Sequence, residues 1–461
     1  MRPHLWSCVL RAALLLCAVA VPARATELHV DPLLGSDATG NGSPAAPFRS
    51  LTRALQVAQG GDTVRGHAGI YSPVSGEQFP LLLKSGVAVV GAGRGQAFLI
   101  GLPSAVAVRA DQTLSATTVL QGFTLRSFDT GIEVLSTGAQ ARLLDLRLEG
   151  GRLGVRIAAV GAGTLAPRLE RCLFLGPSAH GVRIEGVAAA TVRPVLVNCV
   201  FQLAGASGLV LIPQVPGSVL QPVVSYSTFC RNGTRAVEVR GGSGAALPEV
   251  YNSILVGQTV DLDAIDPIHT GNNLLGASLL LGVRGNYAGD PRFVDEAGGD
   301  LHVGQGSAVL DRADPALPET PTLDLDGQTR GGARDVGADE RVEGTLYVRD
   351  DGGAHPGLPL WCRHVDVPGR YVTIFLSYGV LSPGFPVPGL RGELQLDVGL
   401  LLLPMFFGQV AATGYVDGPI HIPNDSAIAG LTVFLQSVGV GYAPALSGGW
   451  SDVLTPTILG Q

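Results

Sequence analysis

The chain has 461 residues and a mass of 47.5 kDa, enough for two or three domains. Glycine (64 residues) and proline (31 residues) are abundant, only 15% of the residues are charged, and the mean hydropathy is +0.32. This composition is typical of many short strands and tight turns, and it excludes coiled coils, collagen and long helical bundles. The net charge of −7 argues against binding to nucleic acid or to an anionic membrane surface.

The first 25 residues have the pattern of an export signal. Arg2 and Arg11 precede an apolar run, Ala12–Val21, and Ala23-Arg24-Ala25 supplies a cleavage site. We therefore predict a signal peptide over residues 1–25 and a secreted or cell-surface protein. A later apolar stretch, Val398–Ala412, is too short for a membrane anchor and is interpreted as a pair of buried strands. The sequence thus predicts no transmembrane anchor.

Four cysteines remain after the predicted signal peptide: Cys172, Cys199, Cys230 and Cys362. Export would permit disulfides, but four cysteines in a chain of this length cannot form a disulfide scaffold. The sequence contains no CxxC motif or Cys/His cluster of the kind that binds zinc.

The middle of the chain repeats with a period of 23 to 28 residues. A six-residue, strand-like element begins at Leu120, Leu143, Leu169, Leu196, Val224 and Val250. A second short element follows in phase, beginning at Gly131, Gly154, Gly181, Gly208 and Ala236. Such a period indicates a solenoid. The fixed frame of leucine-rich repeats is absent, and the short, β-branched, glycine-punctuated segments favour a parallel β-helix instead.

Side-chain alternation predicts which residues face the interior of the coils. The sixth residue of the first element is always large and apolar: Leu125, Leu148, Phe174, Phe201, Phe229 and Leu255. Because coils stack about 4.8 Å apart, the three phenylalanines should form a ladder. Cys172 and Cys199 should be direct neighbours, either as two buried thiols, which we favour, or as a disulfide between coils. In the second element Glu133, Arg156, Arg183 and Glu238 point outward; exposed charge pairing is the simpler interpretation, and a ligand-binding stripe the alternative.

The N-terminal region carries the marks of a cap. Phe48, Leu51, Leu55 and Ala58 have helical spacing, with Ser50 near the helix start, which predicts a short amphipathic helix that plugs the open end of the coils.

The same region also carries recognisable motifs. These are His29-Val-Asp-Pro, Pro47-Phe-Arg-Ser-Leu-Thr-Arg-Ala-Leu, Gly61-Asp-Thr-Val-Arg and Gly69-Ile-Tyr. Together they resemble the N-terminal module called DUF1565, which opens many bacterial right-handed β-helix proteins of the pectin-lyase-like fold. Further along, Asp290-Pro-Arg-Phe-Val-Asp, Gly306-Ser-Ala-Val-Leu-Asp, Asp324-Leu-Asp-Gly and Asp335-Val-Gly-Ala-Asp-Glu resemble the tail of "choice-of-anchor Q" β-helix proteins.

We therefore predict an all-β protein with two domains. A right-handed parallel β-helix spans residues 26–342, with the DUF1565-like cap and first coils over 26–100 and the tail motif over 290–342. A small β-sandwich-like domain follows over 343–461. Its expected strands are Tyr371–Leu376, Glu393–Val398 and Leu431–Gln436.

The resemblances indicate the architecture but not the activity, because such proteins include lyases, hydrolases and members without known chemistry. We favour a non-catalytic secreted or surface protein that binds a polysaccharide, a cell-surface glycan or another surface partner. The alternative is a polysaccharide-active enzyme, either a lyase or a glycoside hydrolase. No catalytic, cofactor-binding or metal-binding residue is assigned from the sequence.

Two groups of acidic residues are candidates for a functional site. Asp261, Asp263 and Asp266 cluster on one repeat, but a solvated loop explains them better than the carboxylate pair of a hydrolase. Asp324-Leu-Asp-Gly resembles part of an EF-hand loop, with Asp335 at position 12. Calcium there is the alternative to a structural turn, which the family resemblance favours.

A lyase would need a base, and the sequence does not supply one in a recognisable place. Lys84 is the only lysine and is expected to be an exposed strand residue. The arginines on the repeats are Arg126, Arg147, Arg156 and Arg183. Arginine is a poor base because its pKa exceeds about 12, and no carboxylate cluster lines up beside these residues. The sequence therefore predicts no lyase activity.

Overall fold

The computed structural model describes residues 25–262, 267–276, 278–342, 345–348, 359–387, 390, 393–400, 403–412, 414–423, 431–441, 447–451 and 458. The predicted signal peptide therefore lies outside the described residues, apart from its last position. Among the described residues, no helix is long and apolar enough to cross a membrane.

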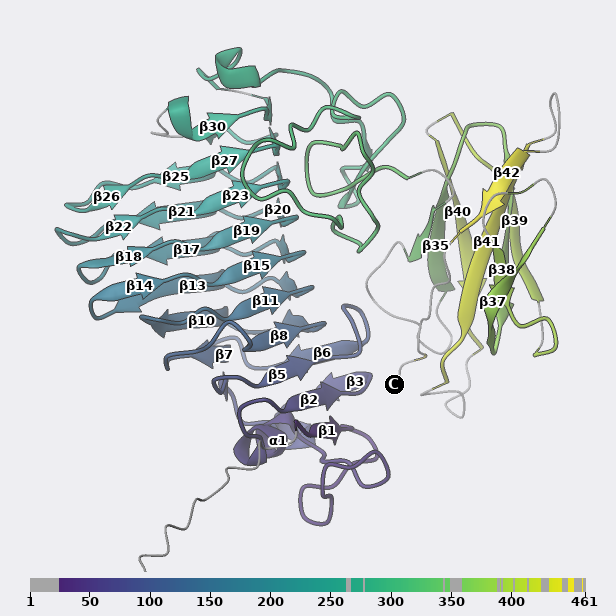
Figure 1. Cartoon of the computed structure of the whole chain (residues 1–461), viewed down its shortest axis with the longest axis horizontal. Helices are drawn as coiled ribbons and strands as arrows, with labels where there is room; N and C mark the ends of the chain where they lie inside the picture. The colour runs from purple at the N-terminus through teal and green to yellow at the C-terminus, as the bar shows by residue number, and fades with distance from the viewer. Residues whose placement is uncertain are drawn as a thin grey trace, which may run out of the picture.

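Short parallel strands stack into a β-helix with three long sheets, I, II and III, and a shorter sheet IV (Figure 1). Sheet I contains β1 (Glu27–Val30), β2 (Thr63–Gly66), β5 (Ala88–Val90), β8 (Val119–Gln121), β11 (Arg142–Leu144), β15 (Arg168–Glu170), β19 (Val195–Val197), β23 (Val223–Ser225), β27 (Glu249–Tyr251) and β30 (Thr270–Gly271). Sheet II contains β3 (Gly69–Tyr71), β6 (Ala97–Ile100), β9 (Thr124–Arg126), β12 (Arg147–Glu149), β16 (Leu173–Leu175), β20 (Val200–Gln202), β24 (Thr228–Cys230), β28 (Ile254–Val256) and β31 (Leu274–Leu275). Sheet III contains β4 (Leu81–Leu82), β7 (Val106–Ala110), β10 (Thr130–Ser136), β13 (Leu153–Val160), β17 (His180–Glu185), β21 (Ser207–Ile212), β25 (Arg235–Val239) and β29 (Val260–Leu262). Sheet IV contains β14 (Gly163–Leu165), β18 (Ala190–Val192), β22 (Val219–Leu220) and β26 (Ala245–Ala246). The parallel β-helix predicted from the repeats is confirmed.

The first repeated element is two strands rather than one. Each unit leaves sheet I, bends at one residue and enters sheet II. The bend residue has a positive φ in successive coils: Gly122, Asp145, Arg171, Asn198, Tyr226, Asn252 and Asn272. Glycine and asparagine tolerate this left-handed conformation, whereas Arg171 and Tyr226 hold it at a cost that the surrounding coils must offset.

Inside the coils, the predicted stacking is confirmed. The rings of Phe174 and Phe201 stack with centroids 4.7 Å apart, and those of Phe201 and Phe229 with centroids 4.3 Å apart. Adjacent strands pair Phe174 with Phe201 and Phe201 with Phe229 in register. One core cluster contains these rings and the inward residues of sheet III, so the β-helix has a continuous apolar interior.

The predicted capping helix is α1 (Leu51–Val57), at the N-terminal end of the coils (Figure 1). The Ser50 hydroxyl accepts a hydrogen bond from the Arg53 amide at 3.0 Å, as an N-cap does, and Leu51 and Leu55 join the core. Lys84 is not the exposed strand residue expected from the sequence. It follows β4, and its Nζ donates to the carbonyl oxygens of Gln56 (2.9 Å) and Ala58 (3.1 Å) at the end of α1.

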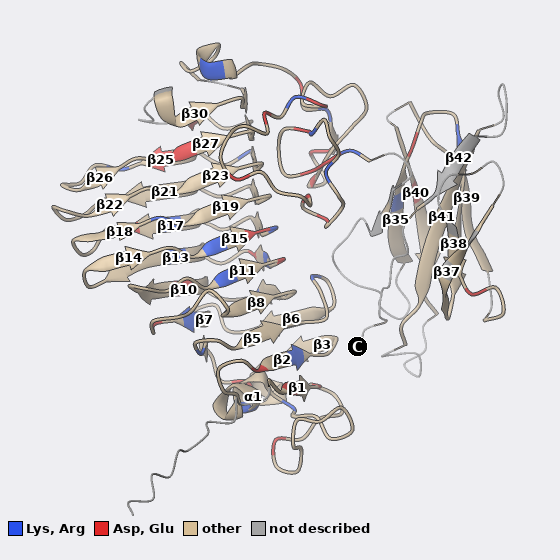
Figure 2. Ribbon diagram, viewed as in Figure 1, with Lys and Arg blue, Asp and Glu red and all other residues tan. Residues whose placement is uncertain are grey.

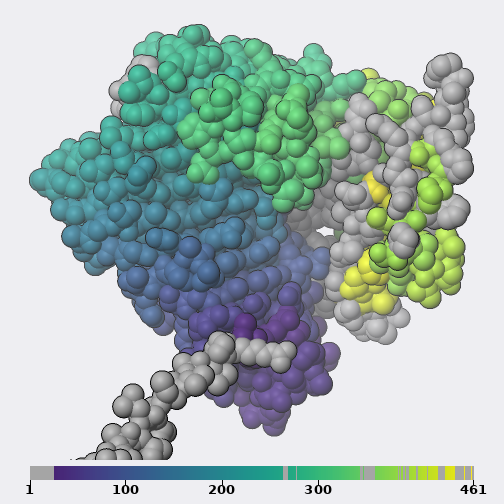
Figure 3. Space-filling model, in the orientation of Figure 1, coloured from purple at the N-terminus to yellow at the C-terminus, as the bar shows by residue number. Residues whose placement is uncertain are grey.

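Three short 3₁₀ helices complete the connections: η1 (Pro73–Ser75), η2 (Pro267–His269) and η3 (Val283–Gly285). Beyond η3 lies the segment 290–342, called the tail here, with an antiparallel pair, β32 (Phe293–Asp295) and β33 (Asp300–Val303). Leu301, Leu325 and Ala338 of the tail pack against Val200 and Cys230 on the outer face of sheet II. The tail, green in Figure 3, thus packs on the later coils of sheet II.

Antiparallel sheets form the C-terminal domain (Figure 1). One sheet contains β34 (Thr345–Val348), β35 (Pro359–Val365) and β40 (Tyr415–His421). A second contains β39 (Leu403–Gln409), β36 (Tyr371–Ser377), β41 (Phe434–Gly441) and β42 (Ser447–Trp450), and a two-stranded sheet contains β37 (Val380–Pro386) and β38 (Glu393–Leu396). The small all-β domain is confirmed, but Val398–Ala412 is not a buried strand pair: Val398, Leu400, Leu403 and Phe407 are exposed.

Candidate functional site

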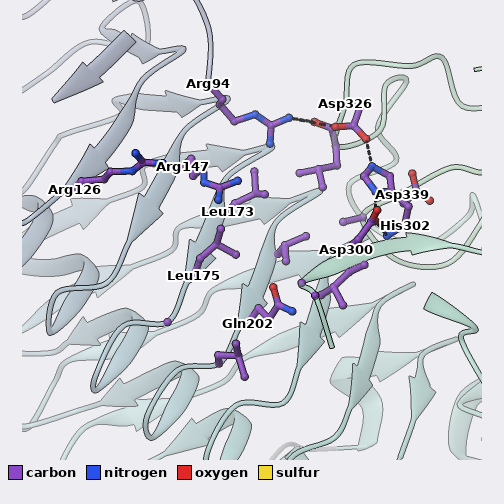
Figure 4. Close-up of a pocket in the computed structure, with 18 residues that line it drawn as sticks. Arg94, Arg126, Arg147, Leu173, Leu175, Gln202, Asp300, His302, Asp326 and Asp339 are labelled. Carbon is purple, nitrogen blue, oxygen red and sulfur yellow. Dashed lines mark hydrogen bonds and ion pairs between the residues drawn. The ribbon is translucent and has the colours of Figure 1, made fainter. Parts of the chain in front are cut away.

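A pocket of about 460 Å³ lies between the tail and the outer face of sheet II (Figure 4). Leu173 and Leu175 on β16 and Val200 on β20 form its aliphatic floor, since these residues alternate outward while Phe174 and Phe201 point into the core. The floor separates two charged walls.

Arginines from the β-helix form one wall. Arg126 ends β9 and Arg147 begins β12, and both pair with Glu149, which lies between them. Burial alone would raise the pKa of Glu149, but the two arginines lower it below its ordinary value. Arg94, in the loop before β6, lies 2.9 Å from Asp145 and 3.4 Å from Asp326, so it joins the β-helix to the tail.

The tail supplies the opposite, acidic wall. His302 on β33 has carboxylates at both ring nitrogens: Asp300 Oδ1 lies 2.5 Å from Nδ1, and Asp326 Oδ2 lies 2.6 Å from Nε2. Asp339 accepts a hydrogen bond from the Val303 amide at 2.7 Å. The ligand atoms of His302, Asp326 and Asp339 all lie within 4.8 Å of one another.

The pKa values of Asp326 and Asp339 are shifted in opposite directions. Burial would raise the pKa of Asp326, but the charges of His302 and Arg94 lower it to about 2. Burial raises the pKa of Asp339 to about 6, and the negative charge of Asp326 adds to that rise. At neutral pH Asp326 is therefore ionised, whereas the pKa of Asp339 lies much closer to the pH of the solution.

Gln202, at the end of β20, completes the floor. Its side chain is 3% exposed, and its amide nitrogen has no hydrogen-bond partner among the described residues. Figure 4 shows the amide directed away from β20 towards the side of the pocket that carries Asp300. A buried amide without a partner costs about 1–3 kcal/mol, which a ligand oxygen would recover.

The structure brings some of the sequence candidates together and separates others. Arg126, Arg147 and Asp326 line the pocket. Asp324 accepts from the amides of Asp326 (3.0 Å) and Gln328 (2.8 Å), and Asp335 accepts from those of Asp311 (2.7 Å) and Arg341 (2.8 Å), so both organise turns. Calcium binding by this loop stays the untested alternative to a structural turn, and the oxygens of Asp324 and Asp335 already accept backbone N–H groups.

The acidic cluster on the repeat is only partly described. Asp263 and Asp266 lie outside the described residues, and Asp261 is buried and accepts from Gln258 at 2.7 Å. The charges on sheet III, visible on β7 and β25 in Figure 2, pair along the axis, but not as exposed pairs. Arg156 bridges Glu133 (3.4 Å) and Glu185 (2.7 Å), and both glutamates are buried. Arg183 pairs with Glu185 on its own strand, and Glu238 pairs with Arg240.

Cys172 and Cys199 are free buried thiols, which is the interpretation we favoured over a disulfide. Their sulfurs lie 3.4 Å and 3.7 Å from the carbonyl oxygens of Leu143 and Leu169 in the preceding coil. The same slot in later coils holds Ser227 and Ser253, which also hydrogen-bond from coil to coil. These thiols are part of the core.

A Ser–His–carboxylate group lies in the C-terminal domain, but it has no access to substrate. His364 Nδ1 lies 2.7 Å from the Ser437 hydroxyl and Nε2 lies 3.3 Å from Asp366. All three side chains are fully buried. A nucleophile must reach its substrate, so this group is structural.

Sequence reasoning missed Arg94, Gln202, His302 and Asp339. Their positions in the chain are separated by up to 245 residues, and only the docking of the tail on sheet II brings them together. The one available signal was the motif Asp300-Leu-His, which places a carboxylate and an imidazole on the same face of a strand.

The fold and this pocket define a parallel β-helix protein with a tail packed on one sheet. Residues 33–190 match the family described as "Protein of unknown function (DUF1565)", so the resemblance of the N-terminal region is confirmed. No curated protein matches the chain.

Solved structures with a similar arrangement include a pectate lyase, Pel9A (13% identity, 69% of this chain and 96% of that chain, TM-score 0.40). A rhamnogalacturonan lyase (14% identity, 54% and 87%, TM-score 0.32) and a lacto-N-biosidase from Eubacterium ramulus (12% identity, 54% and 60%, TM-score 0.32) are also similar. At these identities and scores, they carry no argument about the activity of this chain.

Proposed function

We propose that the protein is exported and binds a saccharide in the pocket between sheet II and the tail, without chemical change to it. The observation that carries the proposal is the buried Gln202 amide without a partner, set among polar walls over an aliphatic floor. Sugar hydroxyls match amide, guanidinium and carboxylate groups, and the C–H faces of a sugar ring match Leu173 and Leu175. Export is supported by the apolar run Ala12–Val21.

The arrangement of charges favours binding over catalysis. A glycosidase places its two carboxylates on either side of the scissile bond, whereas the acids that line this pocket, Asp300, Asp326 and Asp339, all come from the tail wall. Across the floor, Arg126 and Arg147 both pair with Glu149, and the guanidinium of an arginine is a poor base for a lyase. The alternative, a polysaccharide-active enzyme, would have to use groups outside this wall.

Binding is tested by calorimetry on the folded mature chain, with oligosaccharides of polygalacturonate, alginate, cellulose and chitin. We expect one of these classes to bind, and Gln202→Ala and Arg147→Ala to weaken its binding at least tenfold, about 1.4 kcal/mol. Arg152→Ala is the matched control, because Arg152 pairs with Asp129 on the surface and does not line the pocket.

The same samples test the absence of catalysis. Reducing ends and the absorbance of unsaturated products should stay at background over hours, with calcium added. Binding that is equal in all three variants contradicts the assignment of the pocket, and product formation by the wild-type chain contradicts the non-catalytic role.

A further inference from the structure

We propose that His302, Asp326 and Asp339 form a site for one divalent transition-metal ion, and that Zn²⁺ matches it best. One imidazole nitrogen and two carboxylate oxygens, with water from the pocket in the open position, form a donor set that zinc accepts. Tetrahedral zinc with ligands at about 2.1 Å needs ligand atoms about 3.4 Å apart. The three donors lie within 4.8 Å of one another, so shifts of about 1 Å close the site.

Asp300 orients the His302 imidazole in the way that an outer carboxylate orients a metal-binding histidine. Asp300 Oδ1 lies 2.5 Å from Nδ1, and it also accepts from the His302 amide at 3.1 Å. With the Nδ1 proton donated to Asp300, Nε2 is the ligand atom. A carboxylate behind a histidine ligand fixes its tautomer and orientation in zinc sites. Without metal, Nε2 and Asp326 share a hydrogen bond of 2.6 Å, whose proton is released when the ion binds.

Each carboxylate is anchored through one oxygen. Arg94 Nη2 lies 3.4 Å from Asp326 Oδ1, while Asp326 Oδ2 is the oxygen that faces His302. The Val303 amide donates to Asp339 Oδ2 at 2.7 Å. Metal ligands oriented in this way by outer partners need little rearrangement on binding.

The pocket gives an independent indication that a ligand binds here. Gln202 lines the same cavity, is 3% exposed, and its amide nitrogen has no hydrogen-bond partner among the described residues. Its amide points to the side of the pocket that carries the tail (Figure 4). The cavity of about 460 Å³ has room for water beside the three donors and for a ligand oxygen at the amide.

The experiment uses the folded mature chain, stripped of metal with a chelator and then given ZnCl₂ alone. After dialysis, elemental analysis should find one zinc per chain, and calorimetry gives the dissociation constant. Asp339→Asn and Asp326→Asn should bind at least about 100-fold more weakly, the upper end of what removing only an outer partner costs. Asp311→Asn is the matched control, an exposed acid on the same tail.

A second measurement needs no variant. Co²⁺ bound to the wild-type chain should give the visible absorption of a four-coordinate nitrogen–oxygen site, and Zn²⁺ should displace it one for one. Failure of the folded wild-type chain to bind zinc overturns the proposal, and so does equal binding by Asp339→Asn, or Ca²⁺ binding as tightly as Zn²⁺. No saccharide is present, so either proposal can fail without the other.

Discussion

His180 shows how a single buried side chain couples the β-helix to pH. It begins β17, is 4% exposed, and lies near Arg183, Glu238 and Arg240. Burial lowers its pKa to about 4, and the charge of Arg240 adds to this effect, so the native protein holds a neutral imidazole. The corresponding residue on the preceding strand is Leu153, so the position accepts an apolar side chain.

The lowered pKa predicts a loss of stability in acid that depends on this residue. The unfolded chain binds a proton near pH 6.5 and the folded chain only near pH 4, so stability falls as the pH decreases between these values. The loss should reach about 3 kcal/mol at pH 4 relative to His180→Leu, which lacks the group. Urea unfolding at pH 7, 5.5 and 4.5 measures it, with His421→Leu, an exposed histidine, as control. Parallel pH profiles for wild type and His180→Leu would contradict the assignment.

Among the repeated elements, the stacked phenylalanine rings require glycine at the facing positions of sheet III, such as Gly181 and Gly208. A Cβ built at Gly181 would lie 2.7 Å from both the Gly208 carbonyl oxygen and the Phe201 ring, and one at Gly208 would lie 2.6 Å from Phe229. The backbone of sheet III therefore approaches the rings of sheet II too closely for a side chain. Coils without phenylalanine carry leucine at the ring position, as at Leu148.

Phe201→Ala should destabilise the β-helix by about 3–5 kcal/mol, because it opens a cavity between two stacked rings. Phe201→Leu should cost clearly less, since leucine occupies this register in other coils. Chemical denaturation monitored by circular dichroism measures both changes, and Leu203→Ala, with a side chain 48% exposed, is the control. A loss below about 1 kcal/mol for Phe201→Ala would mean that the ring does not support the fold.

Elements were predictable from the sequence because they repeat. Period, inward positions and the capping helix depend on local spacing, and five coils with the same pattern reinforce one another. The sequence did not reveal the bend between the strands of sheets I and II, because in two coils the bend residue is Arg171 or Tyr226. Neither residue type is typical of a left-handed turn. The buried glutamates were missed because Glu133 has the outward alternation of an exposed residue, and only the stacked arginines Arg109 and Arg156 cover it.

On the scale of the whole molecule, the site exists only because separate parts dock. Arg94 from the β-helix, Asp326 from the tail and Arg363 from β35 form one chain of ion pairs through His302 and Asp300. None of these contacts repeats along the sequence, so no period predicts them. The motifs of the tail predicted its presence but not the sheet on which it packs.

Arg363 forms a buried ion pair between the C-terminal domain and the tail. Its side chain is 1% exposed, lies over the Tyr415 ring at 4.0 Å, and pairs with Asp417 in its own domain and with Asp300 in the tail. Breaking a buried pair by removing one partner costs about 3–5 kcal/mol, because the remaining charge stays buried. We therefore expect Arg363→Met, which keeps the aliphatic stem, to loosen the C-terminal domain from the tail. Calorimetric unfolding should split into two transitions, with the β-helix transition near its wild-type temperature.

The control is Arg370→Met, because Arg370 pairs with Asp366 inside the C-terminal domain and leaves the link to Asp300 intact. Asp300→Asn removes the other half of the pair. The double variant should therefore lose less unfolding free energy than the two single variants lose together, and the difference should be about 0.5–3 kcal/mol, the usual range for contacting residues. Small-angle scattering gives a separate measurement, since a loosened domain enlarges the radius of gyration. A single transition and an unchanged radius in Arg363→Met would show that the domain is held by other contacts, such as the Tyr415 hydroxyl donating to the Val294 carbonyl at 3.2 Å.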